Sequence, residues 1–356
     1  LKTEVEKGKH SGERKTHRNG YRVRRWDTRM GTIYLTIPLV RNGGYQPFFL
    51  LHKQRSEAAL VALVQEAWVN GVATRKMERL LKSFGIENIS ASQVSELTKA
   101  LQKDVDQFRR QALKERYSVV WIDALYEKVR EDSKVVSKAI MIAMAINSQG
   151  QKEILAIEPM ENESTETWLV FFDKLKARGL ENIDLLVSDA HPGIQAALRQ
   201  SFLSTTWQRC KVHLMRNILA RVTHSYKKKI GSELKRIFFQ PSFQEALTTA
   251  KEVIQLYKNQ FPEAMDSLSN GIEDALQFLH FPEIPATRIS STNHLERLNR
   301  EIRRRSSVVG IFPSTDSFLR LIGTYLIEYQ EDWATAKAYV APLKLLALLE
   351  VDKIAA

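Results

Sequence analysis

The chain has 356 residues, which is long for a single hydrophobic core, so we expect two or three domains. Its 53 Lys and Arg outnumber 41 Asp and Glu, and a formal net charge of +12 favours a polyanionic partner, most simply nucleic acid. The hydrophobic content of 44% excludes a disordered chain. The longest apolar runs, such as 139–146, are too short to span a bilayer, so we expect no membrane partner.

The cysteine content bounds the compartment. Cys210 is the single cysteine, which excludes an internal disulfide framework and fits a reducing environment. We therefore expect a cytoplasmic, nucleoid-associated protein. No signal peptide is visible, and because the chain begins at Leu1 we expect it to be a fragment of a longer sequence.

The N-terminal segment is strongly basic. Residues 1–25 hold nine Lys or Arg and three Glu, which predicts a mobile arm that becomes ordered on phosphates, the alternative being a merely solubilising tail. Two β-rich runs between Tyr21 and Pro38 predict a hairpin around Asp27–Gly31, with a second turn at Asn42–Gly44. The candidate DNA contacts here are Arg14, Arg18, Arg22, Arg24 and Arg25.

Residues 56–115 have the periodicity of helices. A helix over Arg75–Phe84, a turn over Gly85–Ile89 and a second helix opened by Ser90 predict a helix-turn-helix, whose second helix would enter the major groove. Many helical hairpins without DNA-binding function share this pattern. Arg75 and Lys76 are the candidate DNA contacts of this region.

The next region alternates between strands and helices. Three strands in succession predict an antiparallel meander, and they are followed by helix, strand, helix and strand. This is the order of the ribonuclease H core, an α/β sheet whose acidic residues gather at one edge. The predicted elements are strands at 118–126, 135–146 and 153–158, a helix at 163–178, a strand at 183–187, a helix from 191, and a strand at 205–210.

The rest of the chain is helical. From Lys211 to about Pro285 there is no strand signal, and this predicts an all-helical insertion domain within the α/β core. Residues 317–356 are helical and apolar-rich, which predicts packing on the core or on a partner subunit. We divide the chain into a basic arm with hairpin (1–55), a helical DNA-binding region (56–115), the first part of the core (116–210), the insertion (211–287), a catalytic helix (288–315) and a C-terminal helical segment (316–356).

The stretch 290–305 predicts a helix with two distinct faces. Leu295, Leu298 and Ile302 share the face toward a core, while Glu296 and Asn299 share another face with arginines. One carboxylate among guanidiniums suits a metal held beside a phosphodiester. The alternative is that Glu296 caps the helix in a capping box with Asn293 and that the arginines are solvated.

Three carboxylates form the candidate catalytic set. Asp123 interrupts a strand with the pattern of a buried one, where an ionised carboxylate is costly unless it is paired or bound to a metal. Asp189 follows an apolar strand, the usual ligand position in open α/β sheets. With Glu296 they supply the hard oxygen ligands that a pair of Mg²⁺ ions needs for an in-line displacement at phosphorus.

Four separated motifs resemble the bacterial mutator-type insertion-sequence transposases: WIDALYEKVR, LLVSDAHPGIQAAL, WQRCKVHLMRNIL and NHLERLNREIRRRSSVVGIFPS. The resemblance extends over nearly the whole chain. It implies a DDE transposase with a ribonuclease H-like domain interrupted by a helical insertion, and with Asp123, Asp189 and Glu296 as the catalytic and metal-binding triad. It also implies Mg²⁺ (or Mn²⁺), binding of the element's terminal inverted repeats and of target DNA, a homodimer on two ends, release of a 3′-OH and a circular intermediate.

Other residues lie near these motifs. Cys210 and His213 form a C-x-x-H pair, but two ligands are too few for zinc, so we expect Cys210 buried at a strand end and His213 bonded to a backbone group or a phosphate. His191 is expected at a helix start or facing substrate. The candidate phosphate contacts are Arg297, Asn299, Arg303 and Arg304.

Two other functions remain open from the sequence. A ribonuclease H-like nuclease would hydrolyse DNA without joining it, although such enzymes are usually more compact. A non-catalytic DNA-binding protein derived from a transposase is the other, and the intact acidic set disfavours it.

Overall fold

The computed structural model describes residues 18–28, 31–40, 53–83, 86–87, 91–114 and 116–345. The chain divides into two compact units, Leu1–Lys103 and Asp104–Ala356, and each is described by itself. Residues 1–17, with Arg14, and the expected turn at 42–44 lie outside the described residues.

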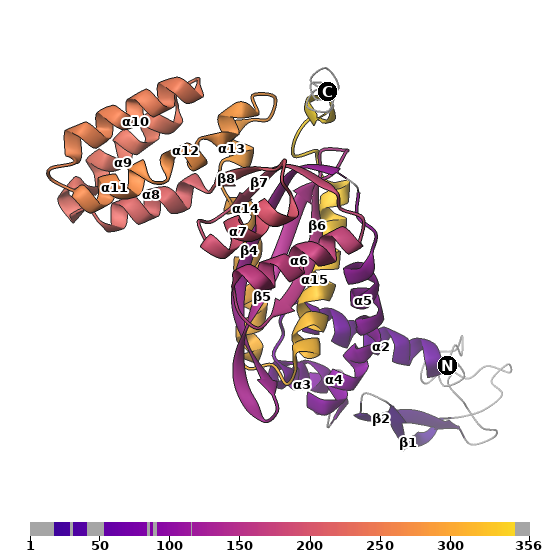
Figure 1. Cartoon of the computed structure of the whole chain (residues 1–356). Coiled ribbons are helices and arrows are strands. Elements are labelled where there is room, and N and C mark those ends of the chain that lie inside the picture. The colour runs from indigo at the N-terminus through magenta and orange to yellow at the C-terminus, as the bar shows by residue number, and fades with distance from the viewer. Residues whose placement is uncertain are drawn as a thin grey trace, which may run out of the picture. The chain divides into compact units, whose positions relative to one another are not determined.

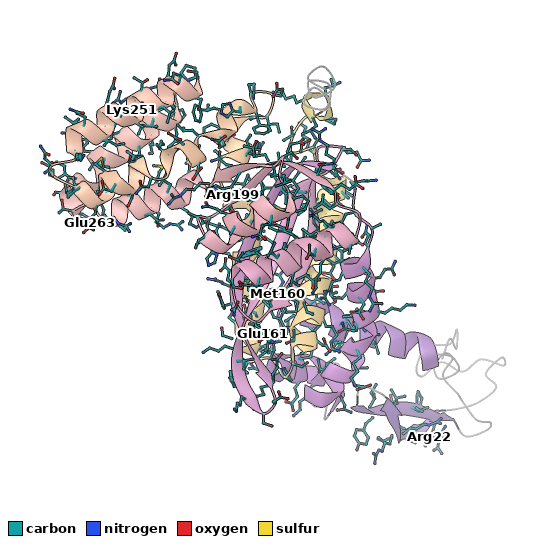
Figure 2. All side chains as sticks on the ribbon, viewed as in Figure 1. Arg22, Met160, Glu161, Arg199, Lys251 and Glu263 are labelled. Carbon is teal, nitrogen blue, oxygen red and sulfur yellow. The ribbon has the colours of Figure 1, made fainter. Side chains whose placement is uncertain are left out.

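The first unit begins with the predicted hairpin. Strands β1 (Arg18–Thr28) and β2 (Gly31–Val40) pair antiparallel, which confirms the expected turn near residues 27–31. Residues 18–25, which we also assigned to the basic arm, lie in β1, where pairing with β2 gives their backbone groups hydrogen-bond partners, and the strand begins three residues before the predicted hairpin. The side chains of residues 21–25 are nevertheless exposed, and Figure 2 shows Arg22 extending from β1.

Three helices form the core of the first unit. They are α2 (Lys53–Val69), α3 (Thr74–Ser83) and α4 (Ala91–Thr98). The helix pair α3–α4 confirms the two helices predicted there, but the connection contains β3 (Ile86–Glu87), which pairs with β2. The predicted cap Ser90 lies outside the described residues. The buried side chains that hold the helices together are Val64, Met77, Leu81, Val94 and Leu97.

The second unit is built on a mixed five-stranded sheet, reached through the 3-10 turn η1 (Lys99–Leu101) and α5 (Gln102–Arg110). The strand order is β6-β5-β4-β7-β8; β4, β5 and β6 form an antiparallel meander, and β7 and β8 run parallel to β4. This confirms the predicted succession of elements. The strands are β4 (Arg116–Glu131), β5 (Lys134–Ile146), β6 (Lys152–Met160), β7 (Asn182–Ser188) and β8 (Thr206–Arg209).

Helices cover both faces of this sheet (Figure 1). Helices α6 (Thr165–Ala177) and α7 (Pro192–Ser201) lie on one face, where Trp168, Phe171 and Phe172 of α6 enter the main hydrophobic core. Helices α14 (Asn293–Val309) and α15 (Thr315–Thr335) contact β4 on the other face. The sheet is therefore buried on both sides, as its long apolar strands require.

A group of helices separates β8 from α14 and lies at the β8 edge of the sheet (Figure 1). All residues from 211 to 289 are described and none is in a strand, as predicted. Within the described ranges, no helix is long and apolar enough to cross a membrane. The helices are α8 (Lys211–Ala220), α9 (His224–Phe238), α10 (Phe243–Tyr257), α11 (Pro262–Ser269), α12 (Ile272–Ala275), the 3-10 turn η2 (Gln277–His280) and α13 (Ala286–Ile289).

A buried glutamine joins the sheet to this helical group. Gln208 of β8 is fully buried; its Nε2 donates to the carbonyl of Ala275 at 2.8 Å, and its Oε1 accepts from the amide of Phe278 at 2.7 Å. The substitution Gln208→Leu leaves both backbone groups without partners, and we expect it to lower the free energy of unfolding by about 2–5 kcal/mol. Denaturant unfolding measures the change. Gln200→Leu, at an exposed position of α7, is the matched control, and equal losses in the two variants would contradict the role of Gln208.

Candidate active site

Helix α14 runs alongside β4 on the face of the sheet opposite α6. Three contacts mark its course: the rings of His294 and Trp121 pack edge to face, Asn299 bonds to Asp123, and Ser306 donates to Glu127 at 2.6 Å. Trp121, Asp123 and Glu127 are odd-numbered residues of one strand, and successive side chains of a strand alternate between faces. The period of β4 therefore directs Asp123 toward α14.

The spacing of these contacts explains how α14 can contact β4 at several points along its length. Trp121 to Glu127 is six strand residues, roughly 20 Å, and His294 to Ser306 is twelve helix residues, roughly 18 Å. Two helix residues thus advance about as far as one strand residue. Because the lengths match, one straight helix presents several side chains to one strand.

Asp123 is a nearly buried carboxylate with two hydrogen bonds. Its Oδ2 accepts from Asn299 Nδ2 at 2.7 Å and its Oδ1 accepts from the amide of Ala124 at 3.0 Å. Burial, together with the negative charge of Asp189, raises the pKa of Asp123 to about 7, although the Ala124 amide and His213 act in the opposite direction. The surroundings of Asp123 therefore disfavour its ionised form more than water does.

Asp189 follows β7 directly. Strands β7 and β4 are parallel and pair Val187 with Trp121, so Asp189 and Asp123 each lie two residues beyond the same pair. Asp189 Oδ1 accepts from the amide of His191 at 3.2 Å. The register of the two parallel strands thus brings Asp123, in the middle of β4, and Asp189, directly after β7, to the same level of the sheet.

Glu296 is held by helix α8. Its Oε1 lies 3.1 Å from His213 Nε2 and 3.4 Å from Arg216 Nη2. The alternative that Glu296 closes a capping box with Asn293 is wrong, because Thr292 occupies the cap position and the helix has no side-chain cap bond. The Glu296 carboxylate is instead oriented by cationic groups of another segment.

Cys210 joins the segments that contribute these acids. Its amide donates to the carbonyl of Ser188 at 2.7 Å, and the amide of Lys211 donates to the carbonyl of Ser290 at 3.0 Å. The amide and hydroxyl of Thr292 both donate to Cys210 Sγ at 3.4 Å. The last residue of β7 and the start of α14 are therefore tied together through a single buried residue, which confirms that Cys210 is buried at a strand end.

The side-chain partner of His213 in this structure is a carboxylate: its Nε2 lies 3.1 Å from Glu296 Oε1. The expected contact with a DNA phosphate stays a prediction. The neighbouring Cys210 thiol raises the pKa of His213 against the opposing effect of burial, and Glu296 adds to the rise. Burial disfavours ionisation of Cys210, but hydrogen bonds from His213 and Thr292 outweigh it and lower the pKa of the thiol. The C-x-x-H pair thus forms an electrostatically coupled link between β8 and Glu296.

A fourth carboxylate, Glu163, also faces this region, and we missed it in the sequence. Burial raises its pKa, and so does the charge of Asp189, while His191 lowers it. His191 caps α7 by accepting from the amide of Gly193 at 3.2 Å, and its Nδ1 lies 3.8 Å from Glu163, so the predicted helix-start role is confirmed. The position of Glu163 in the loop between β6 and α6 was the available signal.

The donor set fits a divalent metal in part. Hard carboxylate oxygens are what Mg²⁺ prefers, and the raised pKa of Asp123 beside Asp189 shows two carboxylates whose repulsion a cation between them would relieve. The buried Asn299 Oδ1 beside Asp123 also has no hydrogen-bond partner. Among the described residues, however, no three His, Cys, Asp or Glu side chains lie close enough together to form a ready-made metal site.

The residues predicted to contact DNA phosphates occupy different environments on α14. Arg297, Arg303 and Arg304 are exposed, although Arg304 Nε pairs with Glu301 at 3.2 Å. Asn299 is buried and its amide donates to Asp123, which favours a positioning role over a phosphate contact.

Comparison with known proteins decides the family. A model of the mutator family of transposases matches residues 2–336. The chain belongs to this family. It is therefore a transposase by descent, and the family expected from the four motifs is confirmed.

Curated relatives agree with this assignment. The transposase for insertion sequence element IS256 in transposon Tn4001 of Staphylococcus aureus is 38% identical over 90% of this chain and 83% of its own length. The transposase for IS1081 of Mycobacterium tuberculosis is 39% identical over 93% of this chain and 80% of its own length. The transposase for ISRM5 of Rhizobium meliloti is 36% identical over 94% and 84%.

The Asn299–Asp123 bond gives a prediction for this transposase. Asn299→Leu keeps a side chain of similar size but removes the donor to a carboxylate, a bond worth about 1.5–3 kcal/mol. We expect a tenfold to hundredfold fall in transposition frequency in cells (about 1.4 kcal/mol per tenfold) at unchanged protein level. Asn270→Leu, at an exposed position of the helical group, is the control. Transposition at the wild-type frequency in Asn299→Leu would show that the bond is dispensable.

Proposed function

We propose that this mutator-family protein is a DDE-type transposase that cuts and joins DNA at Asp123, Asp189 and Glu296. The observation that carries the proposal is the pair of carboxylates, Asp123 within β4 and Asp189 directly after the parallel strand β7, that the strand register places at the same level of the sheet, with α14 alongside β4. We further propose a ribonuclease H-like catalytic domain interrupted by α8–α13. The strand order β6-β5-β4-β7-β8, with its antiparallel meander followed by parallel strands, supports this fold.

In this proposal Asp123 and Asp189 hold Mg²⁺, or Mn²⁺ in its place, and Glu296 completes the set when DNA is bound. The metal supplies charge stabilisation of the attacking and leaving oxygens in an in-line displacement at phosphorus. The protein orients the ligands: Asn299 fixes one oxygen of Asp123, and His213 with Arg216 holds Glu296. No side chain is then required as a general base, because the metal held by the carboxylates stabilises the attacking oxygen.

The proposed chemistry has two steps. Water attacks a phosphodiester at the element end, the P–O3′ bond breaks, and the 3′ oxygen leaves as a hydroxyl after taking up a proton. That 3′-OH then attacks a second phosphodiester, one P–O bond forms as another breaks, and a second 3′-OH is released. We propose that the joined product passes through a circular form and that two copies of the chain act on two ends.

We also propose that the first unit recognises the terminal inverted repeats. Exposed Arg22, Arg24 and Arg25 on β1 supply positive charge for phosphates. On the helix pair, the charge distribution favours α3 over α4 as the helix nearer DNA. Lys76, Arg79 and Lys82 are exposed on α3, whereas α4 contains no Lys or Arg.

The first test is a nicking and strand-transfer assay on labelled duplex bearing the ends of the insertion sequence. We expect wild-type protein to give 3′-OH ends and joined product with Mg²⁺ and neither with EDTA. Glu296→Gln retains a hydrogen-bonding side chain but lacks the charge, so we expect DNA binding without cleavage. Glu263→Gln removes an exposed carboxylate on α11 (Figure 2) and should behave as wild type.

The same assay separates the other two functions. Cleavage without any joined product would identify a nuclease that only hydrolyses DNA. Binding without cleavage by any of the proteins, with Mg²⁺ or Mn²⁺ present, would identify a DNA-binding protein that has lost catalysis. Equal cleavage by wild type and Glu296→Gln would remove Glu296 from the catalytic set.

A further inference from the structure

The charge of the chain is unevenly distributed just after Asp189. The next acidic residue along the sequence is Glu233, and the 43 residues between them contain eight Lys or Arg. All 43 are among the described residues, and they include β8, α8 and most of α9 up to that glutamate. With 41 acidic residues in the whole chain, a segment of this length is expected to contain several Asp or Glu. Because it contains none, its Lys and Arg side chains have no acidic neighbours within the segment.

Four of these cations share one corner of the helical group. Arg216 and Arg221 are exposed on α8 and its C-terminal cap, and Lys227 and Lys228 are exposed on the first turns of α9. Arg216 and Lys227 line the same shallow hollow, so the two helices bring these charges together. We name these four residues the α8–α9 basic surface.

The basic surface begins at the proposed catalytic acids. His213 and Arg216 contact Glu296, and Arg221 lies eight residues beyond His213, two helical turns along one face of α8. Eight residues of helix advance about 12 Å, which is close to the rise of three to four base pairs at about 3.4 Å each. A straight duplex whose backbone is held at Glu296 can therefore extend as far as Arg221, and Lys227 lines the same hollow as Arg216.

Three of these charges have no ion-pair partner in the part of the chain that the structure describes. Arg216 pairs with Glu296, but no acidic partner is found among the described residues for Arg221, Lys227 or Lys228. The Arg221 guanidinium instead donates to the carbonyl of Asn217 at 2.9 Å. By contrast α10 alternates its charges, with Lys251 next to Glu252. A solvated surface usually mixes both signs, and unpaired cations in line with an active site favour a polyanion.

We propose that the α8–α9 basic surface binds the phosphate backbone of the DNA duplex that contains the bond being cut, within the first half turn from that bond. This inference rests on the proposed function, because it assumes DNA at the acidic residues. It assigns to the helical group a direct contact with substrate, separate from end recognition by the first unit.

The test compares two double variants of the full chain with equal change in charge. Lys227→Gln with Lys228→Gln removes two cations of the surface; Lys251→Gln with Lys258→Gln removes two exposed cations of α10 and its cap. Binding to duplex bearing an insertion sequence end is measured over a range of salt. Each lost phosphate contact reduces the slope of log affinity against log salt by about 0.9, so we expect a slope shallower by about 1.8 for the first variant only.

A second measurement locates the contact. Lys228→Cys is offered DNA with an activated disulfide tethered to one backbone phosphate near the cleaved bond, and thiol exchange should cross-link the two. Wild-type protein should not react, since Cys210 is the only cysteine and is fully buried. Lys251→Cys, on α10 and outside the α8–α9 basic surface, should not react either.

The outcomes distinguish failure of the proposed α8–α9 basic surface from failure of the proposed transposase function. If wild type binds and cleaves but both double variants give the same salt slope, or Lys251→Cys cross-links as well as Lys228→Cys, the basic surface is overturned and the transposase mechanism stands. If wild type neither binds nor cleaves the duplex with Mg²⁺ present, the proposed function fails and the surface fails with it.

Discussion

The buried junction at Cys210 is the constraint on which the arrangement of the second unit depends. A buried amide or carbonyl without a partner is costly, and here the groups of Ser188, Cys210, Lys211 and Ser290 satisfy one another. These bonds join the end of β7, the start of α8 and the approach to α14, which are about 20 and 80 residues apart in the chain. The junction fixes the start of α14 beside the end of β7, and the contacts of α14 with β4 then keep Glu296 on the side of the sheet where Asp123 lies.

A second constraint follows from the course of α14 along β4. Placing Asp123 in a buried strand raises the cost of its charge, and the fold offsets this with the Asn299 amide and the backbone amide of Ala124. Two hydrogen bonds do not remove the repulsion of Asp189. The remaining repulsion between the two carboxylates is what the proposed metal ion would relieve, while Asn299 and the Ala124 amide orient the oxygens of Asp123.

Regular elements were predictable where one physical signal dominated. The long apolar strands, the hairpin at 21–38 and the helices on either side of the sheet follow from hydrophobic period and turn residues. The start of the hairpin was not predictable, because the polar residues 18–20 lack the β-rich pattern that marks residues 21–28. Likewise the short strand β3 between α3 and α4 depends on a distant partner, and a two-residue strand leaves no periodicity to detect.

The sequence by itself determined which residues are chemically notable: an aspartate inside an apolar strand, a second aspartate at a strand end, a glutamate on a basic helix, a single cysteine and a set of motifs in a fixed order. Only the tertiary structure decided their partners. Three contacts show this: Asn299 donates to Asp123, His213 lies beside Glu296, and Glu163 lies beside His191. The residues in each pair are 28 to 176 positions apart in the chain. Such contacts depend on strand register and helix packing, which residue types and their spacing along the chain do not encode.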